Sequence, residues 1–255
     1  MKENIFEGKK ALVVGGSGGI GREISLSLAK CGAELSIHGG HNSEKFDLLV
    51  EEISQISRKK PKIIIQNLLE SQFDELESSE LLFAARNCDI LCVCFGPFVQ
   101  KFLHETNLSD WKKVALFDYA LPGLLVSVAL PQMMENHFGR ILLFGGTGTS
   151  NRSEFSTNTA YAGAKSALNV LVSSTAAFYS EYGITCNAIL PGFTETEYLS
   201  ERQKNELREK MPGKALLSTH SIAESALFLL KNADINGTII RVDRGWSPAQ
   251  KSLKY

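Results

Sequence analysis

Seven short apolar runs, separated by longer amphipathic stretches, constrain the fold of this 255-residue chain more than any other feature. Runs that are apolar at nearly every position suit strands buried on both faces, as in a parallel sheet. In the stretches between them, apolar residues recur at helical spacing, as at Ile20, Ile24 and Leu28. The predicted strands are residues 11–14, 34–38, 62–66, 89–94, 140–144, 184–190 and 238–242.

This alternation predicts an α/β fold. The helices are expected near residues 20–31, 44–59, 72–86, 109–135, 159–182 and 221–231. Strands that alternate with helices form a doubly wound sheet, so we expect a Rossmann-type, seven-stranded parallel sheet flanked by helices on both faces. No linker, repeat or low-complexity segment divides the chain, which indicates a single domain over residues 1–255.

The composition excludes several classes of protein. The net charge is −1, so no global field attracts nucleic acid or an anionic membrane. The apolar stretches are too short to span a bilayer, and the polar N-terminus "MKENIFEGKK" shows no secretory signal. Five cysteines without partners at metal-ligand spacing indicate reduced, mostly buried thiols. We therefore expect a cytoplasmic protein with no metal site, no nucleic-acid partner and no membrane partner.

The most charged stretch of the chain follows the sixth predicted strand. Residues 195–214 read "ETEYLSERQKNELREKMPGK". The segment fits either a solvated helix and loop or a mobile lid, because open α/β sheets bind ligands at the carboxyl ends of their strands. We predict a substrate-loop or lid insertion at about residues 195–215.

A glycine-rich turn joins the first predicted strand to the first predicted helix, in "ALVVGGSGGIGREI" at residues 11–24. Glycines allow a tight turn and let the backbone approach a pyrophosphate at the positive end of the helix. The turn matches three templates, G-x-G-x-x-G from Gly16 and both G-x-x-G-x-x-G and G-x-x-x-G-x-G from Gly15. The strand–turn–helix context predicts nucleotide binding, with packing alone as the alternative.

A tyrosine and a lysine lie four residues apart in "YAGAK", residues 161–165. On a helix, Tyr161 and Lys165 project from the same face. A nearby cation favours the phenolate and lowers the pKa of a tyrosine, which suits proton transfer near neutral pH. Pairs of this spacing also arise by chance, as Tyr198 and Arg202 illustrate.

Together these motifs resemble the short-chain dehydrogenase/reductase family. Further landmarks follow in the family's order, in "DILCVCFG" (89–96), "GRILLFGG" (139–146), "NAILPGFTET" (187–196) and "INGTIIRVDRG" (235–245). The resemblance covers about residues 8–246, and it is strongest to the short one-domain members such as 3-oxoacyl-carrier-protein reductases. It implies an NAD(P)-dependent oxidoreductase that transfers a hydride between a nicotinamide cofactor and a small carbonyl or alcohol substrate.

The resemblance also implies a role for each matched residue. Tyr161 is expected to donate the proton to the substrate oxygen, and Lys165 to lower the pKa of Tyr161 and bind the nicotinamide ribose. Related proteins form homodimers or homotetramers through the helices at 109–135 and 159–182, so the same assembly is expected here. Cofactor contacts are further expected from Gly15, Ser17, Gly18, Gly19, Ile20, Gly21, His41, Asn42, Asn67, Leu68, Phe95, Gly96, Pro191, Gly192, Thr194 and Thr196.

The sequence departs from the family pattern at the reacting centre. Gly146 occupies the position of the usual serine, and Asp118 replaces an asparagine that holds a water next to the lysine. The strand end that is usually Asn-Asn-Ala-Gly retains only Gly96. Candidate substitutes for the serine hydroxyl are Thr147, which we favour as a catalytic residue, Thr149 and Ser150. The alternative to a reductase is therefore a non-catalytic or weakly catalytic dinucleotide-binding protein.

The choice of cofactor depends on the end of the second predicted strand. NAD-binding sheets place an acid about ~20 residues past the glycine loop, and that position is Gly39 here. Residues 35–43 contain no acid to repel a 2′-phosphate and no Arg or Lys to bind one. His41, Asn42 and Ser43 can donate hydrogen bonds to a phosphate, with Arg22 as a further candidate cation. We predict NADP as the preferred cofactor, with NAD possible.

Overall fold

The computed structural model describes residues 4–247 and contains the predicted seven-stranded parallel sheet. The strand order is β3-β2-β1-β4-β5-β6-β9, and every neighbouring pair is parallel. The strands are β1 (Lys10–Val14), β2 (Glu34–Gly39), β3 (Lys62–Ile65), β4 (Ile90–Val93), β5 (Gly139–Phe144), β6 (Ile184–Pro191) and β9 (Ile239–Val242). All seven predicted strands are confirmed. Residues 1–3 and 248–255 of the predicted domain lie outside the described residues.

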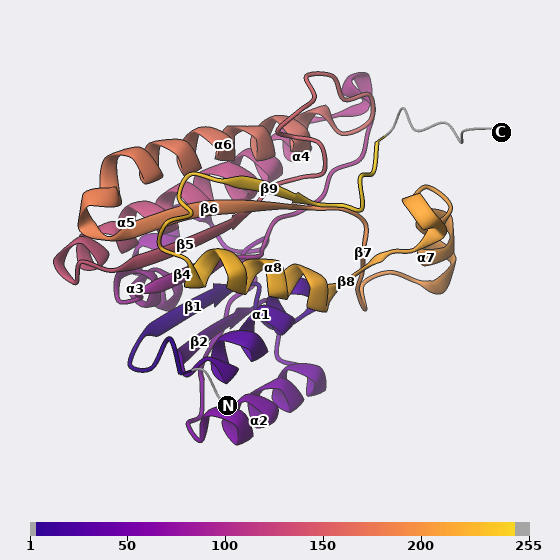
Figure 1. Ribbon diagram of the computed structural model, residues 1–255. Coiled ribbons are helices and arrows are strands. Elements are labelled where there is room, and N and C mark those ends of the chain that lie inside the picture. The colour runs from indigo at the N-terminus through magenta and orange to yellow at the C-terminus, as the bar shows by residue number, and fades with distance from the viewer. Residues whose placement is uncertain (1–3, 248–255) are drawn as a thin grey trace.

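Helices cover both faces of the sheet (Figure 1). One face carries α1 (Gly19–Lys30), α2 (Glu44–Ser57) and α8 (Thr219–Lys231). The other face carries α3 (Glu80–Arg86), α5 (Leu121–Glu135) and α6 (Thr159–Tyr179). β1 shows why the strands are apolar throughout, because Ala11 and Val13 pack into the first helical layer while Leu12 and Val14 pack into the second.

The winding of the chain reverses between β1 and β4. β1 pairs with β2 on one side and with β4 on the other, so the two halves of the sheet meet at these strands. Ligands of doubly wound sheets bind in the crevice at the carboxyl ends of the strands at such a point. The glycine loop follows β1, and Phe95 and Gly96 follow β4. Predicted site residues therefore line both sides of this crevice.

The helix predicted at 109–135 is longer and is interrupted by a π-helical turn. α4 (Leu108–Ala115), the π-helical segment Leu116–Ala120 and α5 run on as one helix of 28 residues. Contrary to the expectation from the sequence, this helix is long and apolar enough to span a bilayer by length and composition, but half of its most apolar stretch is buried inside the fold, as in a core helix. The π-helical turn holds the buried Asp118, and such turns are frequent at functional sites.

Another predicted helix, at 72–86, is divided in two. A 3₁₀ helix spans Phe73–Ser78, and α3 begins after Ser79. The Ser79 side chain accepts a hydrogen bond from the backbone N–H of Leu82, which caps the start of α3. Ser79 itself is extended, so it ends one helix and starts the next.

A small unit follows β6. The short parallel strands β7 (Thr194–Glu195) and β8 (Leu217–Ser218) pair with each other, and α7 (Glu201–Arg208) lies between them in the sequence. In Figure 1 this unit projects to the right of the sheet, beyond the ends of β6 and β9. α7 has no fully buried residue, and its contribution to the main core is the partly buried Leu207.

Candidate active site

The glycine loop passes close to the chain that follows β4. Gly15 has a φ of +73°, and a Cβ on it would lie 3.1 Å from the backbone nitrogen of Phe95. Gly19 also has a positive φ, of +51°. A Cβ on Gly21 would lie 2.1 Å from the carbonyl oxygen of Gly15. All three positions of the G-x-x-x-G-x-G template are therefore restricted to glycine.

His38, near the end of β2, holds this loop in place. Its Nδ1 accepts a hydrogen bond from the N–H of Gly15 at 3.2 Å, and its Nε2 lies 2.9 Å from the carbonyl oxygen of Gln66. Only the neutral ring accepts at Nδ1 while it donates at Nε2. Burial lowers the pKa of His38, which favours that neutral state. His38 was not predicted, because a single histidine in a strand matches no motif.

The start of α1 suits the pyrophosphate of a dinucleotide. The helix has no acidic residue in its first turn, and its N-cap, Gly18, has no side chain to cap it. The N-terminal end of a helix carries a partial positive charge and N–H groups that bind anions. In this structure the N–H of Gly19 donates to a carboxylate oxygen of Glu197 at 2.9 Å. The loop residues from Gly15 to Gly21 therefore fit an anionic cofactor.

Three of the predicted catalytic residues lie together at the same edge of the sheet. Tyr161 and Lys165 are in the first two turns of α6, and Asp118 approaches Lys165 from the π-helical turn. The Nζ of Lys165 donates to the carbonyl oxygen of Phe144 at 2.9 Å and lies 3.1 Å from Oδ1 of Asp118. The same Nζ is 5.9 Å from the centre of the Tyr161 ring.

Gly96 makes room for the ion pair between Lys165 and Asp118. A Cβ on Gly96 would lie 2.2 Å from Oδ1 of Asp118 and 2.8 Å from Nζ of Lys165. Both charged side chains are buried. The glycine that ends "DILCVCFG" therefore has a steric role in the site, besides the cofactor contact that the resemblance implies.

The buried carboxylate dominates the electrostatics of the site. Burial raises the pKa of Asp118 to about 6, against the opposing effect of Lys165. Neither carboxylate oxygen accepts a hydrogen bond of good geometry from residues 4–247. Burial, and then the charge of Asp118, raise the pKa of Tyr161 above its usual value. The expected lowering of the Tyr161 pKa by Lys165 is not seen, because the lysine is paired with Asp118 and the phenol is shielded from water.

The position of the missing serine lies beside Tyr161. A Cβ on Gly146 would lie 2.9 Å from Cε1 of the Tyr161 ring. The hydroxyl of Thr147 donates to the carbonyl oxygen of Pro191 at 2.7 Å, and that of Thr149 donates to the carbonyl oxygen of Gly146 at 2.8 Å. Within residues 4–247, neither hydroxyl is hydrogen-bonded to Tyr161.

The other predicted cofactor residues lie along the same edge of the sheet. His41 and Asn42 are exposed between β2 and α2. Asn67 and Leu68 follow β3, and the Asn67 side chain accepts from the N–H of Leu69. The remaining four end or follow β6, and they are Pro191, Gly192, Thr194 and Thr196.

Three residues near the site were not predicted. The Phe98 ring packs edge-on against Tyr161 with ring centres 4.9 Å apart, and 60% of Phe98 stays exposed. Glu197 and Tyr198 lie over the glycine loop. These contacts join residues far apart in the chain, so the sequence did not mark these residues singly, although Glu197 and Tyr198 lie in the segment at 195–215 that was predicted as a lid.

The five cysteines are free thiols that are largely shielded from solvent. Four are buried, and Cys94 is half-buried. Burial raises the pKa of Cys186 to about 12, which keeps its thiol protonated and unreactive. Within residues 4–247, no group of three or more His, Cys, Asp or Glu side chains is arranged to hold a metal ion.

The fold and the site define a dinucleotide-binding oxidoreductase of the doubly wound class. The family profile described as short chain dehydrogenase matches residues 9–207. The chain therefore belongs to the short-chain dehydrogenase/reductase family, whose members are oxidoreductases that use a nicotinamide cofactor.

Individual relatives match along nearly the whole chain. A 3-oxoacyl-[acyl-carrier-protein] reductase of Aquifex aeolicus is 29% identical over 94% of this chain and 98% of its own length. An L-rhamnose 1-dehydrogenase (NADP(+)) of Thermoplasma acidophilum is 33% identical over 94% of this chain and 96% of its own length. A solved 3-oxoacyl (acyl-carrier-protein) reductase from Agrobacterium tumefaciens C58 with NADP bound has the same fold, with a TM-score of 0.83 at 22% identity, covering 96% of this chain and 97% of that one.

We expect acid to weaken the fold through His38. Its pKa in the folded protein lies below the value of about ~6.5 in the unfolded chain, so the unfolded chain takes up the proton first. The stability that the neutral His38 contributes is therefore complete above about pH 6.5. It is lost as the pH falls towards the folded-state pKa. Urea unfolding at a series of pH values measures this slope. His38→Gln should flatten it, whereas the exposed His104→Gln should not. Equal slopes in all three proteins would contradict the assignment.

Proposed function

We propose that this protein transfers a hydride between NADP(H) and a carbonyl or alcohol substrate, with Tyr161 as the proton donor. The observation that carries the proposal is the meeting of Tyr161, Lys165 and the glycine loop at one edge of the sheet. Gly96 links the two halves of this site, because it contacts the Lys165–Asp118 pair and directly follows Phe95, which touches Gly15. Membership of an oxidoreductase family supports the same reading.

A bound nicotinamide cofactor would supply or accept the hydride. Tyr161 gives its proton to the substrate oxygen as negative charge develops there. Its pKa is raised by burial and by Asp118, so the phenol is protonated at neutral pH. In this state the phenol is the acid for the reduction of a carbonyl.

Lys165 and Asp118 position the site. An ammonium group has three N–H donors. The carbonyl of Phe144 accepts from one of them, and Asp118 lies 3.1 Å from the ammonium as an ion pair, so a donor remains for a ribose hydroxyl. Above its pKa of about 6, Asp118 carries a negative charge that balances the positive charge of Lys165.

A second candidate function is dinucleotide binding with little or no catalysis. Gly146 offers no hydroxyl beside Tyr161, and the hydroxyls of Thr147 and Thr149 donate to backbone carbonyls. Loss of one donor to a developing oxyanion costs on the order of 10²–10³ in rate. The presence of both Tyr161 and Lys165 favours catalysis, and Thr147 is the substitute donor that we propose.

The end of β2 supports NADP as the preferred cofactor. A Cβ on Gly39 would lie 2.8 Å from the Ser17 side chain and 2.9 Å from the Phe46 ring. A carboxylate at this position, which would favour NAD, therefore has no room. His41 and Asn42 are exposed just before α2 and can donate hydrogen bonds to a 2′-phosphate, although Ser43 caps this helix and its first turn is acidic, with Glu44 and Asp47. Arg22 lends little support, because it is paired with Glu52 at 2.7 Å.

The proposed substrate is a mid-sized, partly apolar carbonyl or alcohol compound in the cytoplasm. It would reach Tyr161 past the exposed Phe98 ring, between the chain after β4 and the segment at about residues 195–215 that we propose as a lid. The two relatives described above are named for a 3-oxoacyl group and for L-rhamnose, so both compound classes are candidates here.

Tyr161→Phe should lower kcat by about ~10²–10⁴, the contribution of a general acid, and leave cofactor affinity nearly unchanged. The assays measure the oxidation of NADPH in the presence of a 3-oxoacyl thioester and the reduction of NADP⁺ in the presence of L-rhamnose. Tyr179→Phe, at the far end of α6, is the matched control. If Tyr161→Phe keeps more than about a tenth of the wild-type kcat, a group other than Tyr161 donates the proton, which would contradict the proposal. Wild-type protein that binds cofactor and turns over no substrate would favour the second function.

Lys165→Ala should weaken both turnover and cofactor binding. This variant is a less specific test, because it leaves Asp118 buried without its cation.

NADPH should bind more tightly than NADH in a fluorescence titration of the full chain. His41→Ala should weaken NADPH binding and leave NADH binding unchanged, because only NADPH carries the 2′-phosphate. NADH affinity thus serves as the internal control for damage to the site. Equal or tighter binding of NADH by the wild-type protein would overturn the preference.

The protein should form a homodimer or a homotetramer. Large apolar side chains are exposed on the surfaces of α4, the π-helical turn and α6, and they are Leu108, Trp111, Tyr119, Val170 and Phe178. Burial of these side chains between two copies of the chain favours their association. Light scattering should therefore give a multiple of the monomer mass, and Phe178→Glu should shift the protein towards monomer. Phe83→Glu, on α3, is the control, and a monomeric wild-type protein would contradict the prediction.

A further inference from the structure

The segment that follows β7 covers the glycine loop. A Cβ on Gly18 would lie 2.0 Å from the Tyr198 hydroxyl and 2.6 Å from Oε1 of Glu197. A Cβ on Gly19 would lie 3.2 Å from the Tyr198 ring and 3.5 Å from the Thr196 methyl group. Gly18 and Gly19 are accordingly buried, although a phosphate-binding loop must reach its ligand. Residues 196–198 thus occupy the space next to the start of α1.

Glu197 supplies an anion to this helix end. Its Oε1 accepts a hydrogen bond from the N–H of Gly19 at 2.9 Å, across 178 residues of sequence. α1 lacks both a capping side chain and an acid in its first turn, so the carboxylate of Glu197 takes the capping position. A carboxylate and a phosphate are bound at a helix N-terminus by the same N–H groups and the same partial positive charge. The two anions therefore compete for one donor.

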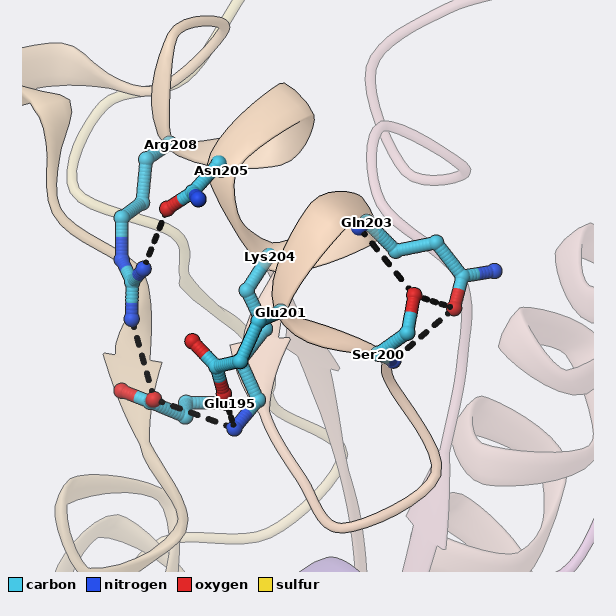
Figure 2. A network of polar contacts seen from close by, with 7 residues as sticks. All are labelled: Glu195, Ser200, Glu201, Gln203, Lys204, Asn205 and Arg208. Carbon is cyan, nitrogen blue, oxygen red and sulfur yellow. Dashed lines mark hydrogen bonds and ion pairs between the residues drawn. The ribbon is translucent and has the colours of Figure 1, made fainter.

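A separate polar network holds the neighbouring residues together as a folded unit (Figure 2). The carboxylate of Glu195, on β7, lies 3.0 Å from Arg208 and 3.5 Å from Lys204, both on α7. Ser200 and Gln203 form the capping box that begins α7. Glu197 bonds to the glycine loop instead of to these residues. The segment can therefore leave the loop by giving up the contacts of Glu197 and Tyr198, while β7 and α7 keep theirs.

We propose that Glu197 is an internal competitor for the pyrophosphate of the cofactor, and that residues 196–198 must leave the glycine loop before the cofactor binds. The inference rests on the dinucleotide binding proposed above. A ligand that binds only the open form shows an affinity reduced by the fraction of open molecules. Weakening the Glu197 contact therefore tightens cofactor binding without adding a contact to the cofactor.

Glu197→Gln tests the competition, because it keeps the shape of the side chain and removes its charge. The Kd for NADPH should fall by about 3- to 10-fold, in line with the loss of a charged hydrogen bond at a helix end. The Kd for NADH should fall by a similar factor, since both cofactors carry the pyrophosphate. Glu201→Gln is the matched control, because Glu201 is exposed on the same segment and pairs with Lys204 at 2.7 Å. Its Kd values should equal those of the wild-type protein.

Hydrogen exchange gives a second readout that needs no cofactor. In the free protein, the amide of Gly19 is protected by the carboxylate of Glu197. A peptide that contains residues 16–20 should therefore exchange faster in Glu197→Gln than in the wild-type protein, and at the wild-type rate in Glu201→Gln. Equal exchange in all three proteins would show that the contact does not form in solution.

The outcomes separate this inference from the function on which it rests. Unchanged Kd values in Glu197→Gln, or equal tightening by Glu197→Gln and Glu201→Gln, would overturn the competition alone. Failure of every variant and of the wild-type protein to bind either cofactor would overturn the proposed function, and the competition with it. Tightening confined to Glu197→Gln, together with faster exchange at Gly19, would support the inference.

Discussion

The buried ion pair between Lys165 and Asp118 is the contact on which the site depends. It joins α6 to the π-helical turn of the long helix, and the hydrogen bond from Lys165 to Phe144 adds the end of β5. Gly96, after β4, must lack a side chain for the pair to form. Removal of one partner of such a pair typically costs about 3–5 kcal/mol, because the other charge remains buried. Lys165 therefore ties α6 to the long helix and to the end of β5, and Tyr161 lies one turn before it on α6.

Asp118 also changes the electrostatics that an asparagine would leave in its place. An amide is neutral, whereas this carboxylate pairs with Lys165 and contributes to the raised pKa of Tyr161. The net effect is a protonated phenol beside a lysine whose charge is balanced by Asp118. A raised pKa makes the neutral phenol a weaker acid, so it gives up its proton only as negative charge develops on a nearby oxygen. The departure from the family pattern therefore bears on the acidity of Tyr161.

The glycine loop is contacted on one side by a buried residue of the sheet and on the other by an exposed segment. His38 lies within the fold and bonds the N–H of Gly15, so it belongs to the rigid frame of the sheet. Glu197 and Tyr198 come from an exposed segment with few buried neighbours, which is where local opening requires least free energy. The same loop thus has a buried support and an exposed cover. In the opening that we propose, the support stays in place while the cover leaves.

The sequence determined the sheet, the glycine loop and the Tyr161–Lys165 spacing, because these follow from local periodicity and from residue types within one or two turns of chain. Apolar runs marked all seven strands, since a strand covered on both faces has no polar side. The sequence did not reveal that Ser79 divides a helix or that Asp118 lies in a π-helical turn, because both depend on packing against other elements. Only the tertiary structure joined His38 to Gly15, Gly96 to the buried ion pair and Glu197 to Gly19. Such contacts connect distant residues through backbone groups, and backbone groups are the same at every position of a sequence.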